Sequence, residues 1–401
     1  MPKFTVTNVG QIIKASVSFG DLTVLVGAQG TGKSIFLQLF KLCADQDYIK
    51  TLMSDHGQTW NKKSKPEFIE AYLGEGTQQM WRENSRVSVS KPYRSFSPSY
   101  KKTLDAAKER VFYIPAQRAL AMPYGWPSPF RSYNHKTPFV VKNFSENIRL
   151  YLENAQTQKD ELFPMPGRLK QEIREALNNA IFHNASVFQE GESGQKEMRL
   201  HIPTNSEDAS GISYIAWSAG QREFTPLLVG CYKLLPGGKK SKDSNIDWVI
   251  IEEPEMGLHP MAVFSIMALA VDLLSRGYKV IISTHSPSVL DIVWAVKEIN
   301  STKKLDIKDK TDLCCKLFNL PPQPQGGALT RMMESLLNKA LKTYYFNYDS
   351  DMKVNTTDIS TLDPGSDDPV VSGWGGLSGY SGHAADIVAE AITRSQNGKA
   401  E

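Results

Sequence analysis

The chain of 401 residues contains 41% hydrophobic and 22% charged residues, an ordinary balance for a globular protein with a sizeable core. The net charge of +3 is only mildly basic, so it permits a nucleic-acid contact but does not argue for one. The sequence lacks the apolar run of a signal peptide, any apolar stretch of about 18 residues and any metal-ligand spacing among its cysteines. We therefore expect a reduced, cytoplasmic protein with no membrane partner.

The first elements lead into a glycine-rich turn. Residues 4–9 and 15–19 alternate between apolar and polar positions, which predicts two strands, and the apolar run 24–26 predicts a buried third strand. The turn after it matches the phosphate-binding P-loop pattern G-x-x-x-x-G-K-[ST] and precedes a predicted helix. The residues of this loop that we expect to bind nucleotide are Gly27, Gln29, Gly30, Thr31, Gly32, Lys33 and Ser34.

Each part of the loop has a physical role. Glycines allow backbone N–H groups to turn toward an anion, and the helix N-terminus that follows adds a partial positive charge. The Lys33 ammonium can reach the β- and γ-phosphates of ATP, and the Ser34 hydroxyl can bind Mg²⁺. Because the four fixed positions coincide by chance in only about one in a hundred chains of this length, the loop predicts a nucleotide site.

The pattern loosens after the P-loop helix. Scattered lysines stand among serines and prolines between residues 46 and 105, and we interpret them as a solvated surface rather than a nucleic-acid contact. The run 111–114 predicts a buried strand that leads to Gln117. The next predicted elements are helices near 141–155 and 166–184 and strands at 198–202 and 212–217.

The second half is more regular. The short apolar runs 248–251 and 280–282 flank a predicted helix at 260–276, and this spacing indicates a βαβ unit and hence a parallel sheet. The proline-rich stretch 321–327 predicts a boundary. Beyond it we expect a helix at 328–342, a hairpin that turns at residues 349–351, and a final short helix.

A second candidate anion site follows the strand at 212–217. Ser218, Gly220 and Gln221 stand directly before an apolar helix, where a helix N-terminus can hold a phosphate. The same residues can equally cap the helix without any ligand, because serine is a favoured N-cap residue. Taken alone, the pattern favours the cap.

Two further signals stand at strand ends. The strand at 248–251 ends in Glu252 and Glu253, of which one can hold Mg²⁺ and the next can polarise the attacking water. The neighbouring strand at 280–282 leads to His285, at the edge where open α/β sheets bind ligands. The alternatives are a solvated strand end and a structural histidine, and we favour contact with the γ-phosphate.

The order of these signals resembles that of the ABC-type ATPases, and within them the soluble RecF-like, SMC-like and OLD-family branch. The sequence motifs that resemble those of this branch include Tyr-Ile-Pro-Ala-Gln-Arg at 113–118, Glu-Glu-Pro-Glu at 252–255, Leu-His-Pro at 258–260 and Ser-Thr-His-Ser-Pro at 283–287. The resemblance implies an α/β fold with a mostly parallel core sheet, an antiparallel β subdomain and a largely helical insertion. The implied divisions are an ATPase core at 1–45 and 201–300, an inserted lobe at 46–200 with a core strand near 111–118, and a C-terminal accessory region at 301–401.

The resemblance also implies a role for each matching residue. Lys33 and the loop glycines hold the phosphates of ATP, Glu252 stands on the Mg²⁺ side, and Glu253 takes the position of the catalytic base. His285 is the switch histidine, and Gln117 is a candidate for the Q-loop glutamine near the metal. The signature, which in this family contacts ATP bound to the opposite protomer, consists of Ser218, Gly220 and Gln221.

Three residues differ from those usual in the sequence motifs of the family. Gln29 stands where the soluble branch often has Asn, Ala219 replaces the first glycine of a Gly-Gly pair, and Glu252 stands where transporters carry Asp. The last exchange preserves the charge. We expect the first two to alter the rate of turnover without abolishing nucleotide binding.

The resemblance implies an ATP-sandwich homodimer or higher homo-oligomer that hydrolyses ATP slowly and acts as a sensor, scaffold or regulator. OLD-family nucleases carry a metal-dependent nuclease after the ATPase, which needs a glutamate at a strand end and a later Asp-x-Asp. Asp349-Ser350-Asp351 has this pattern, but it lies in a polar turn with no matching upstream glutamate. We therefore expect a separate effector such as a nuclease, as in ATPase subunits of bacterial anti-phage systems such as Septu and PARIS. Nucleic acid or a phage component is a further candidate partner. The alternatives are a RecF/SMC-like DNA-repair ATPase and, less favoured, a transporter subunit.

Overall fold

The computed structural model describes residues 2–100, 107–154, 161–191, 196–203, 210–237, 242–321, 324 and 326–377. The strands are β1 (Lys3–Val9), β2 (Ile12–Ser18), β3 (Leu22–Gly27), β4 (Trp81–Val89), β5 (Val111–Ile114), β6 (Glu161–Phe163), β7 (Ser186–Glu190), β8 (Glu197–His201), β9 (Ile212–Ser213), β10 (Trp248–Glu252), β11 (Lys279–Thr284), β12 (Leu341–Tyr348) and β13 (Val354–Asp358). The helices are α1 (Lys33–Asp55), α2 (Lys65–Leu73), α3 (Phe139–Glu153), α4 (Gln171–Leu177), α5 (Ala219–Leu234), α6 (Pro260–Ser275), α7 (Pro287–Ser301), α8 (Ile307–Leu317), α9 (Ala328–Leu337) and α10 (Pro369–Ser372).

Within these ranges the strands form two sheets, of which the larger has the order β4-β1-β2-β13-β12-β3-β11-β10-β5. The run β12-β3-β11-β10-β5 is parallel throughout, and the predicted βαβ unit is confirmed as β10, α6 and β11. The flank made of β4, β1 and β2 is antiparallel. The predicted α/β fold with a mostly parallel core is therefore confirmed, and the carboxyl ends of β3, β10 and β11 meet at one edge.

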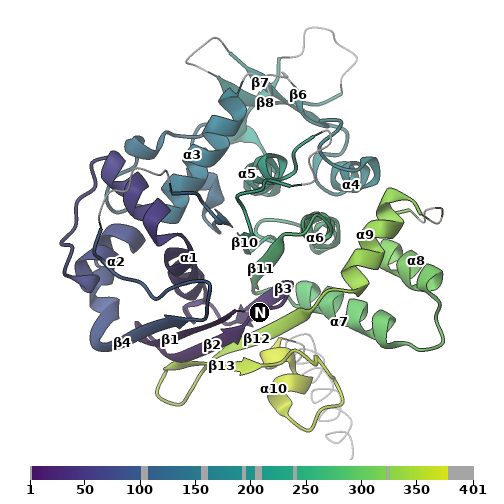
Figure 1. The fold of residues 1–401 in the computed structure, drawn as a ribbon. Coiled ribbons are helices and arrows are strands. Elements are labelled where there is room, and N and C mark those ends of the chain that lie inside the picture. Colours follow the sequence, from purple (N-terminus) through teal and green to yellow (C-terminus); the bar gives the residue numbers. More distant parts are fainter. Residues whose placement is uncertain are drawn as a thin grey trace, which may run out of the picture.

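The large sheet has a core on each face, because successive side chains of a strand point to opposite sides. In β3, Val24 and Val26 join the core that α5 to α9 cover, whereas Leu25 joins the core that contains α1 and α2. Figure 1 shows α1 and α2 on one side of the sheet and α6 to α9 on the other. This burial on both faces explains the unbroken apolar runs in the sequence.

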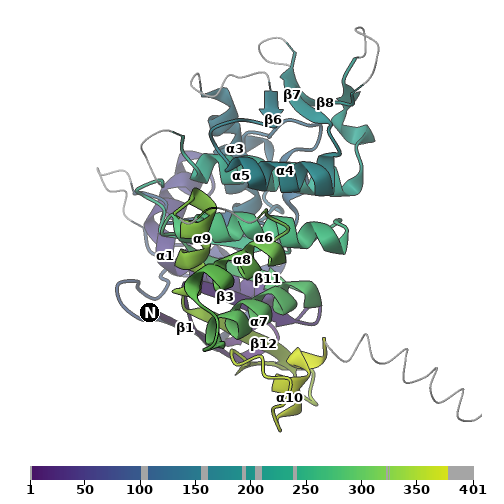
Figure 2. The same cartoon turned by 90° about the vertical axis from the view of Figure 1, so that its right-hand side faces the viewer.

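The smaller sheet is antiparallel, with the order β6-β7-β8-β9, and lies beside α4 in both views (Figures 1 and 2). It confirms the predicted antiparallel subdomain and the strand near 198–202. The expected strand at 212–217 is shorter than predicted, because β9 ends at Ser213 and a 3₁₀ turn follows at Tyr214–Ala216. Tyr214 and Trp217 turn their rings into the core there and pack against each other, which ends the strand.

The C-terminal region is a correction to the expected division of the chain. We expected 301–401 to be an accessory region, but β12 pairs with the P-loop strand β3 and β13 pairs with β2, so this hairpin completes the core sheet. Its turn at 349–351 is confirmed, since the Asp349 carboxylate accepts hydrogen bonds from the Asp351 and Lys353 backbone N–H groups at 2.9 Å. The final helix that we expected lies outside the described residues.

The inserted region 46–200 also differs from the expected helical lobe. Its strand β4 pairs antiparallel with β1 and forms one edge of the large sheet, while β6, β7 and β8 belong to the smaller sheet. The alternation of exposed and buried residues in β4 is weak, which is why periodicity did not reveal it. In the part of the chain that the structure describes, no helix combines the length and apolarity needed to cross a bilayer.

A buried ion network holds α1 against the amino end of β5. The Lys41 ammonium donates to Asp45 Oδ2 at 3.0 Å and to Glu109 Oε1 at 2.8 Å, and all three side chains are almost fully buried. Asp45 departs from helical geometry inside α1, and its carboxylate accepts from the backbone N–H groups of Arg110 and Val111. The network therefore fixes the helix that begins at the P-loop to the amino end of β5.

Candidate functional site

The P-loop lies at the carboxyl end of β3, between the strand and α1. Gly30 and Gly32 adopt left-handed φ angles of 80° and 82°, which glycine tolerates far better than other residues. A Cβ on Gly32 would lie 3.1 Å from the Ile12 side chain, and one on Gly27 only 2.3 Å from the Phe346 carbonyl oxygen. Glycines are therefore required here by backbone conformation and by close packing against β2 and β12.

Lys33 is the first residue of α1 and points back into the loop. Its side chain is only 5% exposed, and its Nζ donates to the carbonyl oxygens of Gly27 at 2.8 Å and Ala28 at 3.0 Å. Burial lowers the pKa of Lys33 to about 8, while the carboxylates of Glu253 and Glu252 oppose this shift. A buried ammonium with a lowered pKa gains from any anion that approaches, as a phosphate would.

Glu252 ends β10 and is 3% exposed. Its Oε2 accepts from the Ala116 backbone N–H at 3.2 Å, whereas its buried Oε1 receives no hydrogen bond from the described residues. Burial raises the pKa of Glu252, and the hydroxyl of Ser34 is the foremost influence that lowers it. A buried carboxylate oxygen without a donor, next to a serine hydroxyl, is a donor set that fits Mg²⁺.

Glu253 and His285 meet across neighbouring parallel strands. Glu253 has a left-handed φ of 43°, unusual for a residue other than glycine, and its backbone N–H donates to the Ser283 carbonyl at 2.8 Å. The His285 Nε2 lies 3.3 Å from Glu253 Oε1. The hydrogen bond from His285 lowers the pKa of Glu253 and burial opposes it, so the carboxylate is held in the ionised form that a general base requires.

Glu255 is a residue whose role our sequence reasoning missed. Its Oε1 accepts from the Thr284 hydroxyl at 2.6 Å and from the His285 backbone N–H at 3.0 Å. The third acid of Glu-Glu-Pro-Glu therefore fastens the loop that carries His285. The only signal in the sequence was that this acid belongs to the Glu-Glu-Pro-Glu motif on which the family resemblance rests.

Ser218, Gly220 and Gln221 form the start of α5. Ser218 Oγ accepts from the Gln221 backbone N–H at 3.3 Å, and Gln221 Oε1 accepts from the Ser218 N–H at 3.2 Å, which together make a capping box. A Cβ on Gly220 would lie 2.9 Å from the Gly257 carbonyl oxygen, so the signature packs against the turn after β10. The capping alternative is thus present in the structure, and the nucleotide contact stays a prediction.

The remaining candidates lie at the same edge of the sheet. Gln117 is exposed and precedes a 3₁₀ turn after β5, next to the Ala116 N–H that binds Glu252. Gln29 is exposed at the tip of the P-loop, whereas Thr31 is buried and donates its hydroxyl hydrogen to the Ala28 carbonyl at 2.8 Å. Gln29 and Gln117 are thus free to reach a ligand, whereas Thr31 shapes the loop.

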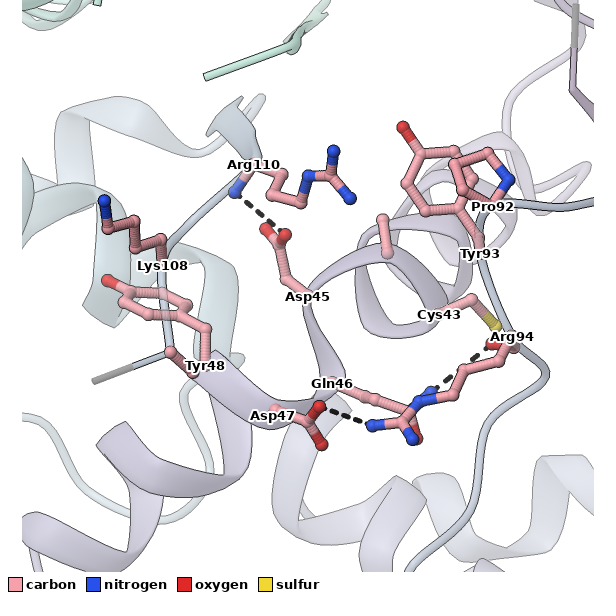
Figure 3. A pocket seen from close by; sticks show the side chains of 12 residues that line it. Cys43, Asp45, Gln46, Asp47, Tyr48, Pro92, Tyr93, Arg94, Lys108 and Arg110 are labelled. Atoms are coloured by element: carbon pink, nitrogen blue, oxygen red, sulfur yellow. Dashed lines mark hydrogen bonds and ion pairs between the residues drawn. The ribbon is translucent and has the colours of Figure 1, made fainter. Parts of the chain in front are cut away.

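A separate polar cavity lies at the opposite end of β5. Figure 3 shows its lining between α1 and the segment around Tyr93. The cavity has a volume of about 480 Å³. Both arginines that line it form ion pairs: Arg110 pairs with Asp247, and Arg94 pairs with Asp47. Because this cavity lies away from the P-loop edge, we do not assign it to the nucleotide.

Comparisons with known proteins agree with the resemblance drawn from the sequence. A family described as "AAA domain, putative AbiEii toxin, Type IV TA system" matches residues 126–291. The Old nuclease of Escherichia phage P2 is 45% identical over 181 residues, which cover 40% of this chain and 28% of that protein. This chain therefore matches little more than a quarter of the relative's length. The resemblance to the soluble, OLD-like branch of ABC-type ATPases is confirmed.

Comparison with solved structures gives matches of low TM-score, of which three are described here. An SMC head bound to the C-winged helix domain of ScpA has a TM-score of 0.37 at 11% identity and covers 89% of this chain and 96% of its own. The SMC head domain from Thermotoga maritima has a TM-score of 0.27 at 11% identity, with 72% and 90% covered. An ATP-binding subunit of an ABC transporter has a TM-score of 0.28 at 12% identity, with 72% and 81% covered.

Proposed function

We propose that this chain binds Mg-ATP, hydrolyses it slowly, and closes head-to-tail on a second copy of itself around the nucleotide. The observation that carries the proposal is the meeting of Lys33, Glu253 and His285 at one edge of the sheet. These residues follow β3, β10 and β11, which are adjacent parallel strands. Their arrangement provides a cation for phosphates and an ionised base beside it.

Each residue of the site has a defined task in this proposal. Lys33 and the backbone N–H groups of the P-loop bind the β- and γ-phosphates, and Glu253 accepts a proton from the attacking water. His285 holds the Glu253 carboxylate in place at 3.3 Å. Ser34 and Glu252, with Gln117 as a further candidate, would hold Mg²⁺, which neutralises phosphate charge when it is bound.

The surface around the signature supports a second copy as the partner. Ile215, in the short turn before the signature, and Met261, at the start of α6, are 54% and 56% exposed although both are large and apolar. Tyr124 is 78% exposed, and its neighbour Gly125 packs against Tyr214 beside Ile215. Exposed apolar side chains next to a predicted trans contact favour burial against another protomer.

We further propose that the chain regulates a separate effector, such as a nuclease, in bacterial anti-phage defence, with nucleic acid or a phage component as a further partner. The relative named Old nuclease is much longer than the region matched here. Asp349 belongs to the Asp-x-Asp pattern that could have indicated a nuclease. Its carboxylate instead accepts hydrogen bonds from the backbone of its own turn. The alternative is a RecF/SMC-like ATPase that acts directly on DNA, which DNA-stimulated hydrolysis by the chain alone would favour.

The test is the solution mass of Glu253→Gln with and without Mg-ATP. Loss of the base leaves ATP bound but not hydrolysed, so the variant is expected to double in mass only with Mg-ATP. Lys33→Ala is the matched control, because it removes the phosphate contact and is expected to stay monomeric in both conditions. A monomer of Glu253→Gln that has ATP bound would overturn the self-sandwich, and DNA cleavage by the chain alone would overturn the separate effector.

A further inference from the structure

Arg118 is a buried cation whose contacts the site described above does not use. Its side chain is 0% exposed, and its guanidinium donates three hydrogen bonds to three backbone carbonyl groups. Nε donates to Glu223 at 2.8 Å, Nη1 to Glu252 at 2.9 Å, and Nη2 to Glu253 at 3.1 Å. One side chain therefore joins α5 to the turn that carries both acids of the nucleotide site.

The fork of the guanidinium explains why arginine suits this position. Arginine presents donors in a fixed planar arrangement and keeps its charge, whereas lysine offers a single ammonium on a flexible stem. Burial lowers the pKa of Arg118, and the carboxylates of Glu223, Glu255 and Glu253 oppose that shift. The cation is thus held where acidic side chains surround it and where carbonyl oxygens satisfy its donors.

Arg118 joins the turn that carries Glu253, the proposed base, to the start of α5, which carries the predicted signature. Glu253 holds a left-handed φ of 43°, and such a conformation persists only where its surroundings hold it. On the other side, Glu223 lies one turn after Gly220, which itself packs against the Gly257 carbonyl of the same turn. Arg118 and Gly220 therefore make two adjacent contacts across one junction.

We propose that Arg118 is a positioning residue that locks the Glu252–Glu253 turn to the signature end of α5. The base of one nucleotide site and the signature surface offered to the partner's nucleotide then move as one body. The mechanical coupling within the chain stands on the contacts above. Its consequence for a second copy rests on the function proposed in the preceding subsection.

The first measurement is hydrogen exchange, because it does not depend on hydrolysis. In Arg118→Ala, backbone amides in the turn at 253–258 and in the first turns of α5 are expected to exchange together, about tenfold faster than in the wild type. Guanidinium at about 10 mM should restore both segments by filling the vacated site, and ammonium should not. Arg110→Ala is the control, since Arg110 is half exposed and lies at the other end of β5.

Each outcome decides the proposal. Faster exchange in both segments, with rescue by guanidinium, supports it, whereas a response in only one segment or rescue by neither cation overturns it. If Arg118→Ala does not fold, Arg118→Lys provides the same comparison, and wild-type exchange in both segments would then overturn the proposal.

Hydrolysis separates the failure of this inference from the failure of the proposed function. In the Arg118 variants, kcat is expected to fall about tenfold or more while KM for ATP changes little, because the P-loop is untouched. Guanidinium should restore kcat. A wild-type chain without ATPase activity would overturn the proposed function, and the exchange experiment would still decide the role of Arg118.

Discussion

The His285 imidazole and the Glu253 carboxylate face each other at 3.3 Å, each carried by the end of a neighbouring parallel strand. Glu255 fixes the His285 backbone from one side, and the Ser283 carbonyl fixes the Glu253 N–H from the other. The pair is thus held by backbone contacts before any nucleotide arrives. Such preorganisation is what a catalytic base needs, because less reorganisation is required during the reaction.

Removal of the histidine is predicted to shift the pH dependence of hydrolysis. Because His285 lowers the pKa of Glu253, His285→Ala should raise that pKa, and the base becomes protonated at a higher pH. The acid limb of the kcat–pH profile is therefore expected to move toward higher pH, with a loss in kcat of about 10- to 100-fold at neutral pH. His135→Ala is the control, because His135 is exposed and pairs with Glu75. An unmoved acid limb would show that His285 does not act on Glu253.

Lys33 is predicted to take up a proton when ATP binds. Its pKa is lowered to about 8 by burial, and nearby phosphates should raise it because they stabilise the ammonium. At pH 8 binding should take up about half a proton, and ATP affinity should fall as pH rises above 8. Calorimetry in buffers of different ionisation enthalpy measures this uptake. Lys33→Arg stays protonated and should show none, and equal heats in all buffers for the wild type would contradict the prediction.

The buried ion network is predicted to contribute strongly to stability. Lys41→Met leaves Asp45 and Glu109 buried without their cation, which should reduce the free energy of unfolding by about 3–5 kcal/mol. Arg94→Ala removes an ion pair with Asp47 whose side chains are 67% and 57% exposed, so it should cost less than about 1 kcal/mol. Denaturant unfolding compares the two variants. Equal losses would mean that the network does not stabilise the fold.

The residues of the candidate site could be selected from the sequence because their signals are local. A glycine pattern between a predicted strand and a predicted helix identified Lys33 as a candidate. Paired acids after one apolar run identified Glu253, and a histidine after another identified His285. The roles of Glu255 and Arg118 could not be predicted in this way, because they depend on which backbone groups lie nearby after folding. Short motifs identify the residues of a site better than they identify the contacts that support it.

The position of the C-terminal hairpin could not be predicted for a related reason. The expected order of strands was correct around β10 and β11, which are joined by one helix. β12 pairs with β3, from which it is separated by most of the chain, and no local pattern specifies such a partner. The proline-rich stretch at 321–327 suggested a boundary, yet the strand beyond it completes the core.

The close approach of β12 to the P-loop leads to a final prediction. Gly27 pairs in register with Phe346, and a Cβ on Gly27 would lie 2.3 Å from the Phe346 carbonyl oxygen. Gly27→Ala must therefore push the C-terminal strand and the P-loop apart, so we expect a large fall in melting temperature and a loss of ATP binding.

Gly57→Ala separates this clash from the ordinary effect of losing a glycine. Gly57 has a φ of 76°, but a Cβ there meets nothing within 4 Å, so its replacement should cost only about 1–2 kcal/mol of backbone strain. ATP binding should be unchanged in that variant. If Gly27→Ala binds ATP like the wild type and melts no earlier than Gly57→Ala, then β12 does not press on the P-loop. A larger loss in Gly27→Ala would show that the C-terminal hairpin is needed to form the nucleotide site.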